Sequence, residues 1–328
     1  MKGRVAGAPI SWGVCEVPGW GYQLPADRVL AEMAAVGLTA TEFGPSGYLP
    51  ADPVQRARLL ARHALGAAGG FVPVALHAPG AVEAVGRALD AFGDAHSAGS
   101  GGTHSAGSGG THSAGSGGAH SAGSGGAHSA GSGGGHPVLV LAAATGLDGY
   151  DTRPELDAAE WSRLLSNLDR AAALAAERGI TATLHPHAGT MVEGPDEVHR
   201  VLEGSEIPLC LDTGHLLIGG TDPAELAREA AARIGHVHLK DVTAAVAQKV
   251  AGREISYTEG VAGGLYRPLG QGDVDVAAVV GALEASGYQG WYVLEQDTIL
   301  DGPPADEGPV RAVRESLTYL DGLSGDQR

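Results

Sequence analysis

The chain has few basic residues. It carries 21 Lys and Arg against 38 Asp and Glu, which gives a formal net charge of −17. Nucleic-acid binding needs clustered Lys and Arg to neutralise phosphates, and the sequence has no such cluster, so we expect no nucleic-acid partner. No apolar run approaches the ~18 residues of a membrane span, and the amino-terminal apolar stretch is too short for a signal peptide. We therefore expect a cytoplasmic protein with no membrane partner.

Cysteine is also scarce. The two cysteines, Cys15 and Cys210, both stand in apolar, strand-like contexts. This usage does not indicate a disulfide framework, and we expect both to be buried structural thiols. A glycine-rich phosphate-binding loop is missing after the first expected strand, which argues against a Rossmann fold.

Residues 96–136 are a low-complexity tract of Gly/Ser/His-rich octapeptide repeats. With no apolar side chain larger than alanine, the tract buries too little to offset the entropy of ordering, so we predict a disordered insertion. Its histidines are spaced too flexibly to form a specific metal site. The remaining residues are enough for one large α/β domain, and we treat residues 1–328 as a single domain.

Short apolar runs alternate with amphipathic helical stretches along the rest of the chain. The expected strands are residues 5–12, 38–43, 71–77, 137–143, 181–185, 207–212, 236–240 and 291–295. The expected helices are residues 25–36, 52–68, 82–94, 156–178, 195–202, 223–233, 274–285 and 305–320, and a long Gly-rich connection is expected over 242–272. This alternation predicts a (β/α)8 TIM barrel with the insertion between strands three and four.

Polar side chains gather where four of these strands end. They are His185 and His187, Asp212 and His215, His236 and His238, and Glu295. An Asp at one such place is explained equally well as a helix N-cap. Four strand ends carrying His, Asp, His and Glu are instead typical of a site for a divalent metal at the carboxyl-terminal face of a barrel.

Seven separated motifs carry a family resemblance. They are APISWGV, TEFGPSGYLP, LHPHAGT, LCLDTGHL, HVHLKDV, PLGQGDVD and YVLEQD. In this order they resemble the xylose-isomerase-like barrel superfamily and, within it, the inosose dehydratase group. The resemblance covers the whole chain except the octapeptide tract.

The resemblance implies a metal site with one ligand from the end of each of strands five to eight. By position, the ligands are His185, Asp212, His238 and Glu295. Many epimerases and isomerases of the superfamily have a glutamate at the position of His185, and His187 is near enough to be the alternative ligand. Imidazoles mixed with carboxylates suit Mn or Co, which we expect first, and Zn, Fe or Mg remain alternatives.

The implied reaction is the dehydration of an inosose to a diketo-deoxyinositol in inositol catabolism. In this scheme the metal polarises the ketone, a base removes the adjacent proton to give a metal-bound enediolate, and an acid helps the β-hydroxyl to leave. Glu295 is assigned to metal binding and proton transfer. Proton donation or contact with substrate hydroxyls is assigned to His187, His215 or Lys240, although Lys240 fits equally well as a surface lysine paired with Asp241.

Other residues near the first two strands are candidates for substrate binding. Glu16 and Glu42 are expected to bind substrate hydroxyls, and Trp12 and Tyr48 to form a wall that stacks on the sugar. Core packing is an equal alternative for Trp12. His236 lies one layer deeper than His238 and is expected to support the site from behind.

Two other functions remain open. The first is a ketose or sugar phosphate isomerase or epimerase on the same barrel, which would form no diketone chromophore. The second is a non-catalytic polyol sensor, which predicts ligand-dependent stabilisation without product. In each case the expected partner is a small cyclitol or sugar, and homo-oligomerisation stays open.

Overall fold

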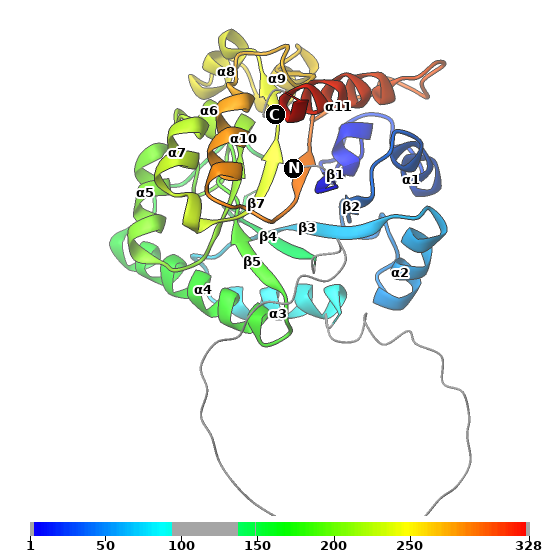
Figure 1. Ribbon diagram of the computed structural model, residues 1–328. Coiled ribbons are helices and arrows are strands. Elements are labelled where there is room, and N and C mark those ends of the chain that lie inside the picture. Colours follow the sequence, from blue (N-terminus) through cyan, green and yellow to red (C-terminus); the bar gives the residue numbers. More distant parts are fainter. Residues whose placement is uncertain (1–2, 94–136, 148, 326–328) are drawn as a thin grey trace, which may run out of the picture.

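The computed structural model describes residues 3–93, 137–147 and 149–325 (Figure 1). The predicted disordered insertion, residues 96–136, lies outside the described residues. Eight parallel strands close into a barrel in the order β1-β10-β7-β6-β5-β4-β3-β2. The barrel strands are β1 (Val5–Gly7), β2 (Ala40–Glu42), β3 (Gly66–Val74), β4 (Val138–Ala143), β5 (Thr181–Leu184), β6 (Leu209–Asp212), β7 (Ile234–Leu239) and β10 (Tyr292–Leu294). This closed sheet confirms the predicted (β/α)8 barrel.

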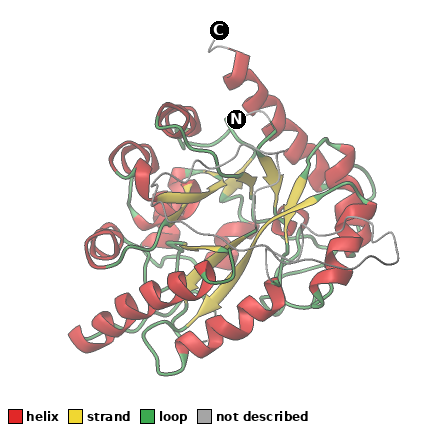
Figure 2. Ribbon diagram, turned by 60° about the horizontal axis from the view of Figure 1, so that its bottom comes forward, coloured by secondary structure: helices red, strands yellow, loops and turns green. Residues whose placement is uncertain are grey.

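Helices surround the strands on the outside of the barrel (Figure 2). They are α1 (Ala26–Ala35), α2 (Pro53–Arg62), α3 (Ala81–Phe92), α4 (Ala158–Ala176), α5 (Pro195–Gly204), α6 (Thr213–Gly219), α7 (Pro223–Glu229), α10 (Val276–Ala285) and α11 (Pro309–Gly325). Local sequence sets several starts. For example, Asp157 and Glu160 form a capping box at α4, and Asp52 caps α2 before Pro53. In the described part of the chain, no helix combines the length and apolar character that a membrane crossing requires.

Alternating side chains divide the core into two parts. Leu139 and Leu141 of β4 belong to the large apolar cluster that includes residues of the surrounding helices. Val138 and Val140, which alternate with them, pack with Cys210 in a small separate cluster. Val138, Val140 and Cys210 line the inside of the barrel, and polar groups fill the interior nearer the carboxyl-terminal strand ends.

Three predicted elements in the amino-terminal part of the chain have wrong boundaries. The first strand ends at Gly7, and Pro9–Trp12 is a 3-10 turn, because proline has no N–H to donate to a sheet. The helix predicted over 52–68 ends at Arg62, and Ala64 has a left-handed φ of 55°. The residues from Gly66 onward then form β3, so this strand starts earlier than predicted.

The connection predicted over 242–272 contains regular structure. It holds β8 (Asp241–Val242), α8 (Ala244–Ala251), α9 (Tyr257–Ala262) and β9 (Tyr266–Arg267), and β8 pairs with β9 in an antiparallel ladder. Figure 1 shows α8 and α9 at one end of the barrel, near α11. Because they follow β7, they lie at its carboxyl-terminal end, where the polar strand ends also meet.

Candidate metal centre and active site

Four predicted ligands meet at the carboxyl-terminal ends of β5, β6, β7 and β10. His185 Nε2 lies 3.2 Å from Asp212 Oδ2, and that oxygen lies 3.5 Å from His238 Nδ1. The same His238 nitrogen contacts Glu295 Oε2. The side chains of His185, Asp212 and His238 are almost fully buried, and that of Glu295 is 14% exposed. The structure therefore brings together the four residues named from the strand ends.

The polar atoms of this cluster lack ordinary partners. Among the described residues, His185 Nε2, Asp212 Oδ2, His238 Nδ1 and Glu295 Oε2 form no hydrogen bond of acceptable geometry. Buried polar atoms are nearly always hydrogen-bonded, so a convergent group without such bonds calls for a further partner. Two carboxylates and two imidazoles form a donor set that suits a divalent transition-metal ion, and their two negative charges balance it. The residues therefore fit such an ion.

Glu42 supports this cluster from behind. Its Oε1 accepts hydrogen bonds from His236 Nε2 at 2.9 Å and from His238 Nε2 at 3.0 Å. Because a carboxylate accepts here, His238 carries a proton on Nε2, and its Nδ1 faces Asp212 and Glu295, where it would ligate a bound ion. Burial alone would raise the pKa of Glu42, but His238 and His236 outweigh it and hold the pKa well below its usual range. The geometry thus supports a role toward the metal ligand, and contact with substrate stays a prediction.

Glu42→Gln is expected to weaken metal binding by about 10–100-fold, the range typical for loss of a partner that orients a metal-ligating histidine. The amide has the shape of the carboxylate but no charge to hold the His238 tautomer. The measurement is the dissociation constant for Mn²⁺ or Co²⁺, determined by chelator competition. Glu32→Gln is the control, because Glu32 bonds Trp12 and Arg28 away from the cluster. An unchanged constant in Glu42→Gln would remove Glu42 from this role.

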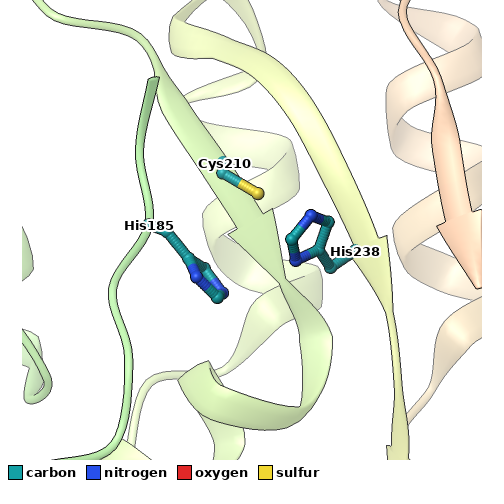
Figure 3. A group of neighbouring side chains, drawn as sticks. All are labelled: His185, Cys210 and His238. Atoms are coloured by element: carbon teal, nitrogen blue, oxygen red, sulfur yellow. The ribbon is translucent and has the colours of Figure 1, made fainter. Parts of the chain in front are cut away.

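Cys210 lies on β6 two residues before Asp212, and its thiol lies beside His238, with His185 on the neighbouring segment (Figure 3). Burial raises the pKa of this thiol to about 11, so it is neutral at pH 7. Both cysteines are free, as predicted, and Cys210 is fully buried. Cys15 is only partly buried, because it follows the 3-10 turn and lines the central cavity.

Lys240 is buried next to the four predicted ligands, so its interpretation as a surface lysine is wrong. Its ammonium donates to Asp297 Oδ1 at 2.8 Å and approaches His215 Nε2 at 3.0 Å. Asp212 Oδ2 and Glu295 Oε2 lie 3.6 and 3.7 Å from Lys240 Nζ. Burial lowers the pKa of Lys240, but the neighbouring carboxylates outweigh it, so the pKa lies well above its usual value. The Lys240 side chain is therefore a protonated ammonium group fixed in place by its carboxylate neighbours.

Asp297, Tyr257 and Tyr266 complete this network, and sequence reasoning assigned them no role. Tyr257 donates to Asp297 Oδ2 at 2.6 Å, and the two tyrosine hydroxyls lie 2.7 Å apart. Asp297 stands two residues after Glu295, so the alternation of a strand end was a usable signal for it. Tyr257 and Tyr266 lie in α9 and β9, and no sequence pattern around them predicted a position near the site.

His187 and His215 lie beside the cluster with their ring centroids 3.7 Å apart. Burial, His185 and Lys240 hold the pKa of His187 well below its usual value, so its ring is neutral. Its Nδ1 donates to the Ala188 carbonyl at 2.7 Å, which leaves Nε2 with the lone pair. Among the described residues, His185 belongs to groups with metal-ligand spacing and His187 does not. The geometry therefore favours His185 as the ligand and leaves His187 free to act as a base.

A cavity of about 370 Å³ opens over these groups. Glu16 lines it and accepts a hydrogen bond from Tyr150 at 3.2 Å, and its contact with substrate stays a prediction. The predicted stacking wall is wrong. Trp12 is fully buried and donates to Glu32, and Tyr48 is not among the cavity-lining residues. Trp12 lies in the 3-10 turn that follows β1, which places its side chain in the core. Trp20 lines the cavity in their place, together with Tyr150 and Tyr257.

Comparison with known proteins agrees with this arrangement. The family model of the xylose isomerase-like TIM barrel matches residues 133–322, which include all four predicted ligands. The chain belongs to this family. As a member of the xylose isomerase-like family, it also aligns with a relative named inosose dehydratase from Geobacillus kaustophilus, at 28% identity over 98% of this chain and 94% of that protein.

A second relative named inosose dehydratase, from Geobacillus thermodenitrificans, is 34% identical over 52% of this chain, and the match covers 57% of that relative's length. Solved structures of the xylose isomerase-like fold are also similar. An L-ribulose 3-epimerase superposes with a TM-score of 0.62 at 17% identity, over 99% of this chain and 96% of that one. A probable 3-DHS dehydratase from Bacillus anthracis has a TM-score of 0.59 at 11% identity, over 97% and 98%. At these identities the structures support the fold alone.

Proposed function

We propose that the protein is a metal-dependent dehydratase that converts a cyclitol ketone of the inosose type into a diketo-deoxy product. The observation that carries this proposal is the cluster of His185, Asp212, His238 and Glu295 with the held ammonium of Lys240 beside it. A metal ion at the cluster would polarise a ketone, and the ammonium of Lys240 can protonate a hydroxyl group as it leaves. Relatives named inosose dehydratase support the substrate class.

The four clustered residues would hold Mn²⁺ or Co²⁺ in preference to an ion that favours oxygen ligands alone. When bound, such an ion supplies Lewis-acid polarisation of a ketone and its neighbouring hydroxyl. Glu42 and His236 keep the lone pair of His238 turned toward the cluster. In this scheme the other polar groups of the cavity carry out the proton transfers.

His187 is the proposed base. Its neutral ring has the Nε2 lone pair free and lines the cavity. Removal of the proton on the carbon next to the ketone leaves the electron pair delocalised onto the carbonyl oxygen as an enediolate. A neutral imidazole suits this step at pH 7, because a protonated ring has no lone pair to accept the proton.

Lys240 is the proposed acid. The enediolate oxygen re-forms the carbonyl, the electrons of the carbon–carbon double bond shift to a new double bond between the α- and β-carbons, and the β-carbon–oxygen bond breaks. The Lys240 ammonium protonates the leaving hydroxyl to release water. The enol product tautomerises to the diketone, and His187 and Lys240 return to their starting states by exchange with solvent. Asp297 and His215 fix the direction of the ammonium.

Asp297→Asn is expected to lower kcat by roughly 10–100-fold with a smaller change in KM, because it removes one of the carboxylate charges that keep Lys240 protonated and in place. The amide keeps the shape of the side chain and a hydrogen bond from Tyr257. Rates of diketone formation at several substrate concentrations give both constants. Asp301→Asn, at an exposed position nearby, is the matched control. A kcat equal to that of the unmodified protein would exclude Asp297 from this role.

The full chain, reconstituted with Mn²⁺ or Co²⁺, tests the function against a panel of cyclitol ketones and ketoses. Appearance of a diketone chromophore from a cyclitol ketone is the expected result. Epimerised ketose with deuterium from solvent, and no diketone, would replace the proposal with an epimerase. Substrate-dependent stabilisation without any product would replace it with a sensor.

A further inference from the structure

The central cavity has two chemically different ends. Imidazoles, carboxylates and Lys240 line the end at the metal cluster. The other end lies between β3 and the helices α2 and α3, and its walls include Phe43, Val72, Ala88 and Phe92. The sequence has three phenylalanines, and Phe71 is the third, so all of them line this one cavity. A chain with 5% aromatic residues thus places every phenylalanine in the cavity wall.

The apolar end is built around Gly70. The rings of Phe43 and Phe92 meet edge to face with centroids 5.1 Å apart. A Cβ atom at Gly70 would lie 2.9 Å from Phe43 and 3.0 Å from Phe92, so a larger residue there would displace this ring pair. The adjacent Phe71 has its ring 5.8 Å from that of His187. Phe71 alternates with Gly70 along β3, so its ring lies on the barrel-facing side of the strand, at the polar end.

Arg56 is a charged residue at the apolar end, and three backbone carbonyls accept hydrogen bonds from it. Its guanidinium donates to the carbonyls of Ala91 at 2.5 Å, Pro50 at 3.3 Å and Phe92 at 3.3 Å. It also lies 4.0 Å from the centroid of the Phe43 ring. Three carbonyls and an aromatic face fix this guanidinium in the wall, so its charge is directed to these partners. The end is therefore suited to a neutral group.

We propose that the substrate is a cyclitol ketone that carries a neutral aryl substituent, and that the apolar end of the cavity is the subsite for that substituent. This inference rests on the proposed function, which places the ketone at the metal cluster. Free cyclitol hydroxyls would lose water against the phenylalanines without gaining partners, which is unfavourable. An aryl group gains from leaving water and from contact with the ring edges and faces. Among the described residues, Ala91 and Pro73 at this end of the cavity are exposed, so this part of the chain leaves the subsite accessible to an attached group.

The first experiment compares substrates of the Co²⁺-loaded full chain. The panel contains the free cyclitol ketone and its mono-O-benzyl and mono-O-butyl ethers, substituted at each hydroxyl remote from the carbonyl. At least one benzyl ether is expected to show a kcat/KM at least tenfold above that of the free ketone and above that of the matched butyl ether. If the free ketone is converted as efficiently as every ether, the subsite is overturned and the dehydratase stands. A butyl preference would overturn the aryl assignment.

The second experiment fills the subsite. Ala88→Phe adds a ring to the apolar end, and it is expected to lower the benzyl-to-free ratio of kcat/KM at least tenfold. Ala277→Phe is the matched control, on an exposed face of α10 outside the cavity. An unchanged ratio in Ala88→Phe, with the protein folded by circular dichroism, would overturn the subsite.

Binding separates this inference from the proposed function. If no substrate gives a diketone, the dehydratase proposal fails, and calorimetry with inositol and its mono-O-benzyl ethers then decides the subsite. Binding of a benzyl ether at least tenfold tighter than inositol, lost in Ala88→Phe, would support it. Equal binding would overturn it.

Discussion

Asp212→Asn is expected to abolish tight binding of one divalent ion per barrel and to reduce dehydration by about 10³-fold or more. Asp212 Oδ2 lies within 3.6 Å of His185, His238 and Lys240, so it is central to the cluster. Losing this anionic ligand removes a bond and half of the balancing charge. Lewis-acid stabilisation is worth several kcal/mol, at about 1.4 kcal/mol per factor of ten.

We choose asparagine over alanine for this substitution because Asp212 is also the N-cap of α6. Its Oδ1 accepts from the backbone N–H groups of Gly214 and His215 and caps α6. Asp212→Ala would also lose this cap, which is worth about 1 kcal/mol of stability. An amide oxygen can keep the cap, so the asparagine variant separates metal binding from folding.

Asp222→Asn is the matched control, because Asp222 caps α7 in the same manner away from the cluster. Metal content of the purified proteins, measured by plasma mass spectrometry beside thermal unfolding, is the readout. Metal at the stoichiometry of the unmodified protein in Asp212→Asn would remove Asp212 from the ligand set. Loss of metal in Asp222→Asn would show that the effect arises from a cap and not from a ligand.

The convergence of the strand-end residues was predictable from sequence for a simple geometric reason. Parallel strands in a barrel all finish at one face, so polar groups at their ends meet whatever the intervening helices contain. His185, Asp212, His238 and Glu295 follow this rule. The family resemblance of the motifs then indicated which of the strand-end residues are ligands. Both the convergence and the ligand assignment could be inferred without knowledge of side-chain contacts.

The parts that were missed depend on tertiary contacts. Tyr257 and Tyr266 reach Asp297 because α9 and β9 fold back over the end of the barrel, and a Gly-rich connection gives no periodic signal of that. The capping box of Ser256 and Glu259 was the one local signal for α9. Trp12 was misplaced because Pro9 ends the strand and the 3-10 turn directs its indole to Glu32.

His185→Glu is the second large effect that we expect. The variant should still bind a divalent ion, because carboxylate and imidazole are both competent ligands. His185 Nε2 faces Asp212 Oδ2 at 3.2 Å, so a third carboxylate at this position would neutralise more of the charge that polarises the substrate ketone. Dehydration should fall by on the order of 10³-fold, while metal content falls far less.

The same substitution should change what the site does to the α-carbon. The introduced carboxylate would lie across the cluster from Glu295. The two carboxylates would then form a pair suited to exchanging a proton between the two faces of that carbon, as the resemblance to the epimerases of the superfamily implies. Solvent deuterium in recovered substrate, measured beside the rate of diketone formation, reports this exchange. His185→Gln is the control, because it removes the imidazole without adding charge. If His185→Glu dehydrates at the rate of the unmodified protein, residue 185 does not set the reaction type. His185 would then give no reason to prefer a dehydratase over an epimerase.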